Sequence, residues 1–563
     1  MMNFFENNNF VSPNGVNLND LNVDEAYFNL TSFFNSRIGV YSLSSDCKRC
    51  PFTYVTSLNK SKIVSVSTKH HMKWRFYNET QSSALKQILD KESLICELNE
   101  SIEEYGIYDI AITKDSCKFS TQREPVNIYW PLCATLVFLL FLHLFIKLAW
   151  NISRRYFSKK RKIAEDEVDI DDNLPAKKTR ISSIDVFRGF ALCLMVFTND
   201  GGGQYWFFNH STWNGLYPPD LLYPWFLWIM GVCIALSQSS HRKNAVKKKT
   251  IIWTTLKRSF ILFVIGLALN TLGVGPVELR HLRIPGILQR IAISYGITSI
   301  LAIFVFDINI SWLNGIKSIL MVLPQWFFHL AIVAAHTYLT FYLPVPGCPL
   351  GFLDPGGIQD GSKYKNCTGG AAGYIDRLLL GENRLWQNAP VRITYQTSPF
   401  DPENILGCLT SIFGTFLGVQ AGYILIVHRK PITRIRHFVT WAILLLALGF
   451  GLHFFDVIPI NKSLWSLSFT LATSGLAFLL FAFIYYVVDY TKLWNGSPFI
   501  YPGMNSILVY VGHEICFQLF PWHWRISFAM NTHFMNLIEN TWGVILWILI
   551  TFCMYKKKIF VVV

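Results

Sequence analysis

Charged residues are scarce in this chain of 563 residues. Only 15% of them are Asp, Glu, Lys or Arg, and 52% are hydrophobic, whereas ordinary soluble domains carry about 25% charged residues. Several apolar runs reach the ~20 residues that a helix needs to cross a bilayer, and the clearest is WPLCATLVFLLFLHLFIKLAW at 130–150. These features exclude an ordinary soluble protein. They predict an all-α polytopic membrane protein with about eleven transmembrane helices.

Several motifs of well-known enzyme classes are also missing. The chain has no Walker motif, no HExxH, no GxSxG and no run of Asp for a divalent ion. Asp200-Gly201-Gly202-Gly203 is too short and isolated for a nucleotide loop. We expect no metal site. No internal repeat is evident, so nothing points to an inverted-repeat transporter.

The N-terminal residues lack the basic stretch and apolar run of a secretory signal peptide. We expect 1–20 to be disordered and 21–125 to form a small, β-rich luminal domain. Four glycosylation sequons begin at Asn29, Asn59, Asn78 and Asn99, and the cysteines there are Cys47, Cys50, Cys96 and Cys117. An even number of cysteines permits two disulfides in an oxidising compartment. Because no second CxxC follows Cys47-Lys-Arg-Cys50, a structural disulfide is favoured there over a redox or zinc half-site.

The net charge of +14 is read as a membrane-topology signal. Lys and Arg gather in alternate short loops, which places those loops in the cytoplasm and gives no reason to expect nucleic-acid binding. The first span, 130–150, is followed by a charged cytoplasmic linker at 151–184 and by a multi-helix domain at 185–555. That domain has a luminal loop at 343–403 and precedes a cytoplasmic tail at 556–563. The ten later spans are expected near 185–199, 220–237, 252–272, 287–306, 319–342, 405–427, 438–455, 465–489, 503–520 and 541–555.

A polar, glycine-rich turn joins two of these apolar segments, within Phe197 to Gly231. Polar, irregular backbone at membrane depth is costly unless it lines a cavity, and an ionisable group there is a functional-site hypothesis. The turn carries Asn199 and His210, on the luminal side of the predicted topology. His210 could abstract a proton or carry an acyl group, and the aromatic residues around it could keep it neutral at acid pH. The alternative is an interfacial His in an aromatic belt.

A second candidate group lies in RHLRIPGILQR, where Arg283 precedes a predicted helix and Gln289 and Arg290 lie inside it. An Arg in an apolar span needs an anion or a carboxylate, and its guanidinium suits bidentate contact with phosphate. The alternative is a structural ion pair, for example with Glu514. Asp185 and Arg188, three residues apart on a predicted helix, can also pair with each other.

A third group lies in YPGMNSILVYVGHE, where Asn505, Ser506 and His513 occur on an otherwise apolar helix. Asn505 and His513 are eight residues apart and therefore share a helix face. A ligand pocket is one interpretation. A satisfied core His is the other.

These segments together resemble one family. The residues that carry the resemblance are SIDVFRGFALCLMVFTNDGGGQYWFFNHSTWNGL, RIPGILQR, LPVPGCPLGFLDPGGIQDGSKYKNCTGGAAGYIDRLLLG, NKSLWSLS and YPGMNSILVYVGHE. They are similar to heparan-α-glucosaminide N-acetyltransferases, over about residues 180 to 563. Three features depart from the family pattern. No signal peptide is evident, the cytoplasmic linker is divergent, and Asp200 stands in place of an aromatic residue. The Asp200 carboxylate could alter the pKa of His210.

The resemblance implies a transmembrane reaction in the lysosomal membrane. Cytosolic acetyl-CoA would donate an acetyl group to the amine of a terminal glucosamine on luminal heparan sulfate, and the enzyme would be a homodimer. The family's catalytic His falls on His210, and a neighbouring Asn falls on Asn199. On this interpretation Arg283, Gln289 and Arg290 would bind the anionic donor, and Asn505, Ser506 and His513 would line its channel. Another membrane acyltransferase, acting on hydroxyls, and a transporter that binds without reacting remain alternatives.

Overall fold

The computed structural model describes residues 17–79, 93–114, 116–162, 180–272, 276–305, 316–526 and 531–561. Residues 18–20 form a short 3₁₀ helix, and most of the N-terminal stretch that is expected to be disordered lies outside the described residues. The predicted linker is helical up to Lys162, and its middle lies outside the described residues.

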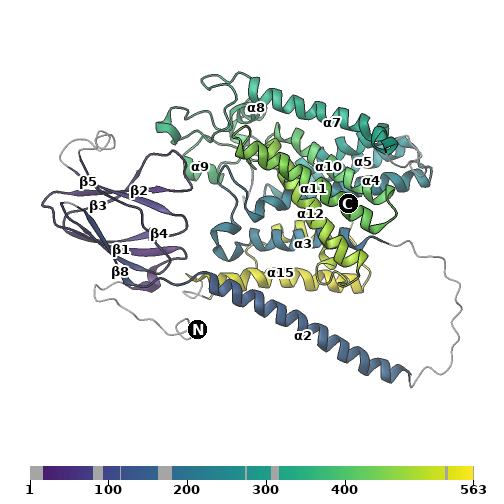
Figure 1. Cartoon of the computed structure of the whole chain (residues 1–563), viewed down its shortest axis with the longest axis horizontal. Coiled ribbons are helices and arrows are strands. Elements are labelled where there is room, and N and C mark those ends of the chain that lie inside the picture. Colours follow the sequence, from purple (N-terminus) through teal and green to yellow (C-terminus); the bar gives the residue numbers. More distant parts are fainter. Residues whose placement is uncertain are drawn as a thin grey trace.

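The N-terminal region is a β-sandwich, which confirms the prediction of a β-rich domain (Figure 1). One sheet has the order β4-β1-β7-β8 and the other β3-β2-β5-β6, with β1 and β7 parallel. Alternate side chains of both sheets, such as Phe28, Ile110, Val40 and Phe76, meet in one apolar core. The strands are β1 (Glu25–Ser32), β2 (Ile38–Ser44), β3 (Thr53–Leu58), β4 (Ser61–Ser67), β5 (Met72–Asn78), β6 (Leu94–Leu98), β7 (Ile107–Ile112) and β8 (Cys117–Arg123).

Helices make up most of the rest of the chain. The helix that follows the sandwich, α2, extends beneath the helical body in Figure 1 and packs against α15. The bounds are α2 (Tyr129–Lys162), α3 (Ser182–Asn199), α4 (Pro218–Lys243), α5 (Lys248–Leu269), α6 (Ile287–Val305), α7 (Ile316–Tyr342), α8 (Gly370–Leu380), α9 (Pro390–Tyr395), α10 (Gly407–Val427), α11 (Pro431–Phe454), α12 (Leu467–Tyr485), α13 (Ile500–Met504), α14 (Ser506–Ile515) and α15 (His533–Lys556).

Within the described residues, eight helices are long and apolar enough to cross a membrane: α2, α4, α5, α6, α10, α11, α12 and α15. This supports a polytopic membrane protein, but eleven spans are not confirmed. The three remaining predicted segments do coincide with helices. Those near 185–199 and 319–342 are α3 and α7, which are not among these eight, and that near 503–520 is broken at Asn505 into the short helices α13 and α14.

The centre of the bundle is built by close helix packing. Helices α4 and α10 approach each other closely, so that a side chain at Gly418 would meet the Trp228 carbonyl and one at Gly231 would meet the Thr415 carbonyl. Glycine is therefore required at both positions because the two backbones touch. This contact holds α4 in place against α10, and residues of α4 line one side of the cavity described below.

The sandwich packs against one end of the helix bundle, which we call the sandwich end; the opposite end is the far end (Figure 1). Arg49 pairs with Asp354 at 2.6 Å, and the Tyr105 hydroxyl donates to the Asn531 carbonyl. Disulfides Cys47–Cys50 and Cys96–Cys117 lie in the sandwich region, and Cys348–Cys367 lies in the loop between α7 and α8. The predicted structural disulfide at Cys47-Lys-Arg-Cys50 is confirmed.

Candidate active site

A cavity of about 900 Å³ runs through the helix bundle. Its lining on α4 extends from Pro219, in the first turn, to His241, in the last. At 1.5 Å per residue these positions are about 33 Å apart along the helix axis, close to the ~30 Å thickness of a bilayer core. A single cavity therefore connects the sandwich end with the far end.

The two ends of the cavity differ in chemistry. At the far end the lining includes four basic side chains, Arg188, His241, Lys257 and Arg258. Arg188 is partly engaged by Asp185 at 2.6 Å, which confirms the predicted pair, and the Arg258 guanidinium stacks on the Tyr295 ring at 4.9 Å. At the sandwich end the lining includes Asn199, His210, Glu403 and Lys462. The middle is largely apolar.

Three glycines shape the turn between α3 and α4. Gly201, Gly202 and Gly203 all have positive φ, which lets the chain reverse directly after Asn199. The side chain of Asn540 on α15 holds this turn, because it accepts from the Gly203 N–H at 2.7 Å and donates to the Asp200 carbonyl at 2.8 Å. The turn is thus anchored before the chain reaches His210.

His210 belongs to a cluster of three ionisable groups. Its Nδ1 lies 2.8 Å from Asp220 Oδ1, and Lys462 Nζ lies 2.9 Å from the same nitrogen and 3.6 Å from Asp220 Oδ1. Asp220 is fully buried in the first turn of α4, where its Oδ2 accepts from the backbone N–H groups of Ser211 and Tyr217. In the tautomer with the proton on Nδ1, Nδ1–H donates to Asp220, Lys462 makes no hydrogen bond to that nitrogen, and Nε2 is the free base.

The surroundings favour the neutral form of His210. Its side chain is 44% accessible, because it faces the cavity. Although part of the side chain faces the cavity, desolvation by the surrounding protein lowers the His210 pKa, the adjacent Lys462 ammonium lowers it further, and Asp220 opposes both. Burial likewise lowers the pKa of Lys462. The Lys462 cation, which the sequence argument did not include, is therefore a cause of the lowered His210 pKa in addition to burial.

Asn199 also faces the cavity, from the end of α3. Its Nδ2 lies 3.1 Å from Nε2 of His513, whose Nδ1 lies 3.2 Å from the Val509 carbonyl. With the His513 proton on Nδ1, Nε2 accepts from one Asn199 amide hydrogen. The second hydrogen of that amide remains available, so His513 orients Asn199 and acts through it.

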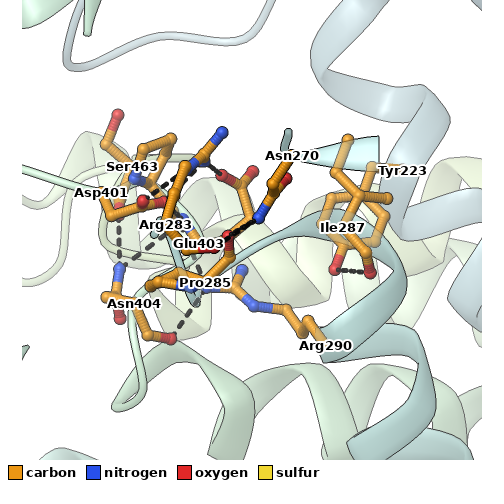
Figure 2. A network of polar contacts seen from close by, with 11 residues as sticks. Tyr223, Asn270, Arg283, Pro285, Ile287, Arg290, Asp401, Glu403, Asn404 and Ser463 are labelled. Carbon is orange, nitrogen blue, oxygen red and sulfur yellow. Dashed lines mark hydrogen bonds and ion pairs between the residues drawn. The ribbon is translucent and has the colours of Figure 1, made fainter. Parts of the chain in front are cut away.

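Arg283 and Arg290 are not among the residues that line the cavity. They belong to a network of polar contacts with Asp401, Glu403 and Asn404 (Figure 2). Arg283 makes two hydrogen bonds to Asp401 at 2.7 and 2.8 Å and one to Glu403 at 2.8 Å. Arg290 is buried and donates to the backbone carbonyls of Pro402 and Asn404. Both guanidinium groups therefore fasten the 401–404 segment to the start of α6, and the geometry disfavours the prediction that they bind the donor. The suggested partner Glu514 lies instead 3.4 Å from His513.

Gln289 and Asn505 are also placed away from the cavity lining. The Gln289 amide is buried against Gly266 and Gly286. Asn505 is buried and binds the C-terminal segment through the Ile559 carbonyl and the Val561 N–H. Of the predicted donor-channel residues, Ser506 alone lines the cavity, while His513 reaches it through Asn199.

Comparison with known proteins identifies the family. Residues 180–347 match the family model described as "Heparan-alpha-glucosaminide N-acetyltransferase, catalytic". The chain is 36% identical to heparan-alpha-glucosaminide N-acetyltransferase of Mus musculus, over 96% of this chain and 89% of that protein. The chain belongs to the heparan-alpha-glucosaminide N-acetyltransferase family. The protein of that name from Homo sapiens is also 36% identical, over 93% of this chain and 86% of that protein. Membership makes this chain an acetyltransferase.

Asp200 does not act on His210 in this member of the acetyltransferase family. Its carboxylate lies 3.4 Å from Nε2 of His523, whose Nδ1 is 2.8 Å from Glu539. Burial raises the pKa of Asp200 to about 7, and His523 opposes that shift. The Asp200 carboxylate therefore lies against His523 and against Gly543 of α15, and its ion pair is with His523 and not with His210.

Sequence reasoning missed two residues of this acetyltransferase site, Asp220 and Lys462. Asp220 follows Tyr-Pro-Pro at a predicted helix start, a position where Asp is ordinarily read as a helix cap. Lys462 lies in NKSLWSLS, a segment that carried the resemblance but showed no site pattern of its own. The available signal was that Asp220 follows the candidate base His210 by only ten residues, so the two side chains could meet.

Proposed function

We propose that this acetyltransferase moves an acetyl group from acetyl-CoA, bound from the far end, to the amine of a terminal glucosamine of heparan sulfate at the sandwich end. The setting is the lysosomal membrane, with the sandwich in the lumen, and the enzyme works as a homodimer. The observation that carries the proposal is the single cavity lined by His210 and Asn199 at one end and by Arg188 and Arg258 at the other. The names of the mouse and human relatives support the acceptor.

The basic far end of the cavity suits the phosphates of the donor. Arg188 on α3, His241 on α4, and Lys257 and Arg258 on α5 supply basic side chains to the cavity lining. Arg forms bidentate contacts with phosphate oxygens, and Lys binds them as a point charge. The apolar middle of the cavity would then hold the uncharged arm of the donor, with Ser506 beside it, and would point the thioester at His210.

His210 acts as the general base of the transfer. Nε2 takes a proton from the glucosamine ammonium, while the Nδ1–H group keeps its hydrogen bond to the Asp220 carboxylate. The neutral amine then attacks the thioester carbonyl. The carbonyl oxygen becomes negative and accepts from the free amide hydrogen of Asn199, a contact worth about 3 kcal/mol in comparable sites. The carbon–sulfur bond then breaks. The thiolate leaving group takes up the proton that the amide nitrogen loses.

An acetyl-His210 intermediate is the second version of this chemistry. The same free Nε2 would attack the thioester first, and the amine would attack the acetyl-imidazole afterwards. In both versions Asp220 holds the imidazole in the reactive tautomer. Transfer in one step requires donor and acceptor together in the cavity, whereas the covalent version predicts ping-pong kinetics.

Acetyl transfer by the purified full-length chain in lipid vesicles tests the proposal. Vesicles receive acetyl-CoA with a labelled acetyl group and glucosamine, and labelled N-acetylglucosamine is measured. His210→Ala should reduce its formation to background, and His281→Ala, in an exposed loop, should not. Wild-type rates in His210→Ala would exclude both versions. Acetylation of hydroxyls alone would indicate an O-acyltransferase, and movement of unchanged acetyl-CoA would indicate a transporter.

A further inference from the structure

The segment that follows His210 is tied to the sandwich by a side-chain hydrogen bond. The Thr212 hydroxyl donates to the carboxylate of Asp46, which lies in the loop after β2. Within the described residues, no other hydrogen bond joins the sandwich to residues 209–217. Thr212 lies only two residues after His210, so this contact bears directly on where the imidazole is held.

The loop that carries Asp46 is itself fastened in place. Disulfide Cys47–Cys50 closes the chain directly after Asp46. The Tyr395 hydroxyl, at the end of α9, donates to the Asp46 carbonyl at 3.1 Å and accepts from the Lys48 N–H at 3.1 Å. The backbone on both sides of Cys47 is therefore attached to the helical part of the chain, and the Asp46 carboxylate is presented to Thr212 from a fixed support.

On the other side of Thr212, the backbone is joined to the catalytic pair. The Ser211 N–H donates to Asp220 Oδ2 at 3.2 Å, and the other oxygen of that carboxylate lies 2.8 Å from His210 Nδ1. A shift of Thr212 would therefore move the Ser211 N–H relative to Asp220 and would turn the imidazole away from the same carboxylate. A misplacement of about 1 Å at a reacting group costs about 10²-fold in rate.

The hydrogen bond between Asp46 and Thr212 can be removed without emptying an apolar core, because both residues are only partly buried. The next residue, Trp213, is buried and has its own anchor, since its Nε1 donates to the Leu353 carbonyl at 2.9 Å. A hydrogen bond to a carboxylate is about twice as strong as one between neutral groups. Its loss should therefore loosen the segment beside His210 while the fold persists.

We infer that Asp46 of the sandwich is a positioning residue for acetyl transfer, which holds His210 against Asp220 through Thr212. Asp46 lines a smaller cavity of about 390 Å³ and is not among the residues that line the cavity of His210. Its effect therefore passes through the segment 210–212. The inference rests on the proposed function, because it concerns the same general base. It makes the sandwich a part of the catalytic unit.

Paired substitutions in the full-length enzyme in vesicles test the inference. Thr212→Val keeps the shape of the side chain and removes the hydroxyl, whereas Thr212→Ser keeps the hydroxyl. Thr212→Val and Asp46→Ala should each lower kcat by about 10- to 100-fold with little change in the KM for glucosamine, and Thr212→Ser should stay near the wild-type kcat. The double variant should be no slower than the slower single variant, because both changes remove one bond. Asp109→Ala, in β7 of the sandwich beside Asn29, is the matched control and should leave kcat unchanged.

The outcomes separate the two hypotheses. Equal kcat in Thr212→Ser and Thr212→Val, wild-type kcat in Asp46→Ala, or additive losses in the double variant would overturn the positioning role while leaving the acetyltransferase proposal intact. A wild-type enzyme that does not acetylate glucosamine would defeat the proposed function. In that case, hydrogen exchange decides on the positioning role: faster exchange of the backbone N–H groups at 209–213 in Thr212→Val than in Thr212→Ser supports it, and equal exchange rejects it.

Discussion

His210 Nδ1 lies 2.8 Å from Asp220 Oδ1, and the two side chains reach each other across the turn into α4. Asp220 is held by two backbone N–H groups at the start of that helix and has no access to solvent. The carboxylate therefore has a fixed position. An Nδ1–H group of His210 can donate to it, and that tautomer leaves Nε2 unprotonated.

Replacing Asp220 by Asn should impair catalysis more than binding. The Asn amide can donate to Nδ1 and would then stabilise the wrong tautomer, with the proton on Nε2. By analogy with other His–Asp pairs, kcat should fall by about 10²- to 10⁴-fold. We expect the KM for acetyl-CoA to change little, since Asp220 is remote from the far end. Steady-state kinetics in vesicles measures both constants. A large rise in KM at constant kcat would contradict this role.

Removing the charge of Lys462 should shift the pH profile. Because the ammonium lowers the pKa of His210, Lys462→Met should raise that pKa, and less neutral base would be present at acid pH. The acid limb of kcat/KM should move to higher pH by about one unit. Lys462→Arg, which keeps the cation, is the matched control and should leave the limb near its wild-type position. An unshifted limb in Lys462→Met would show that the cation does not tune His210.

Two sets of arginines should respond differently to substitution. Arg258→Ala removes a cation from the far end of the cavity, and the KM for acetyl-CoA should rise about fivefold or more. Arg290→Met instead leaves the carbonyls of Pro402 and Asn404 without their buried donor. It should lower the thermal midpoint by several degrees. Kinetics and thermal unfolding of both variants distinguish the roles. A donor KM that rises only in Arg290→Met would restore the prediction made from sequence.

Glu104 should make the junction between sandwich and bundle sensitive to pH. It lies 3.5 Å from His533 and accepts from the backbone N–H of Asp24. Burial raises its pKa from 4.5 to about 7, although His533 opposes the shift. A carboxyl group with a raised folded-state pKa contributes stability below about pH 4.5, and that contribution is lost as pH rises toward 7.

The thermal midpoint of the full chain should therefore fall between pH 5 and pH 7.5. Glu104→Gln, which is neutral throughout, should reduce this fall by about 3 °C. The pKa of Asp200 is also raised to about 7 by burial, so part of the fall in thermal midpoint with rising pH should persist in Glu104→Gln. Thermal unfolding in detergent at several pH values measures the effect. A slope in Glu104→Gln as steep as in the wild type would rule out this group as its source.

Hydropathy and local motifs predicted much of the architecture. The eight apolar helices coincide with predicted spans because the length of an apolar run is a local property. The β-rich domain and the turn carrying His210 were also located from sequence. The number of spans was less certain: the helix expected near 503–520 breaks at Asn505, whose amide binds the C-terminal segment more than fifty residues away.

The roles of charged side chains could not be read in the same way. Arg283 looked like a free cation near a helix start, but its partner Asp401 is 118 residues away. Lys462, 252 residues from His210, had no visible relation to it at all. A local pattern shows that a buried charge needs a partner, yet it does not show which segment will supply one.

The sequence by itself determined that the chain enters a membrane, that a polar turn with Asn199 and His210 interrupts its apolar segments, and which family the chain resembles. The tertiary structure decided that Asp220 and Lys462 complete the cluster around His210, that Arg283 and Arg290 fasten a loop, and that the basic far end of the cavity lies on α3, α4 and α5. The physical reason is the difference in sequence distance over which the two effects act. Hydrophobic runs act over one helix, whereas the partner of a buried charge is set by which distant segments pack together.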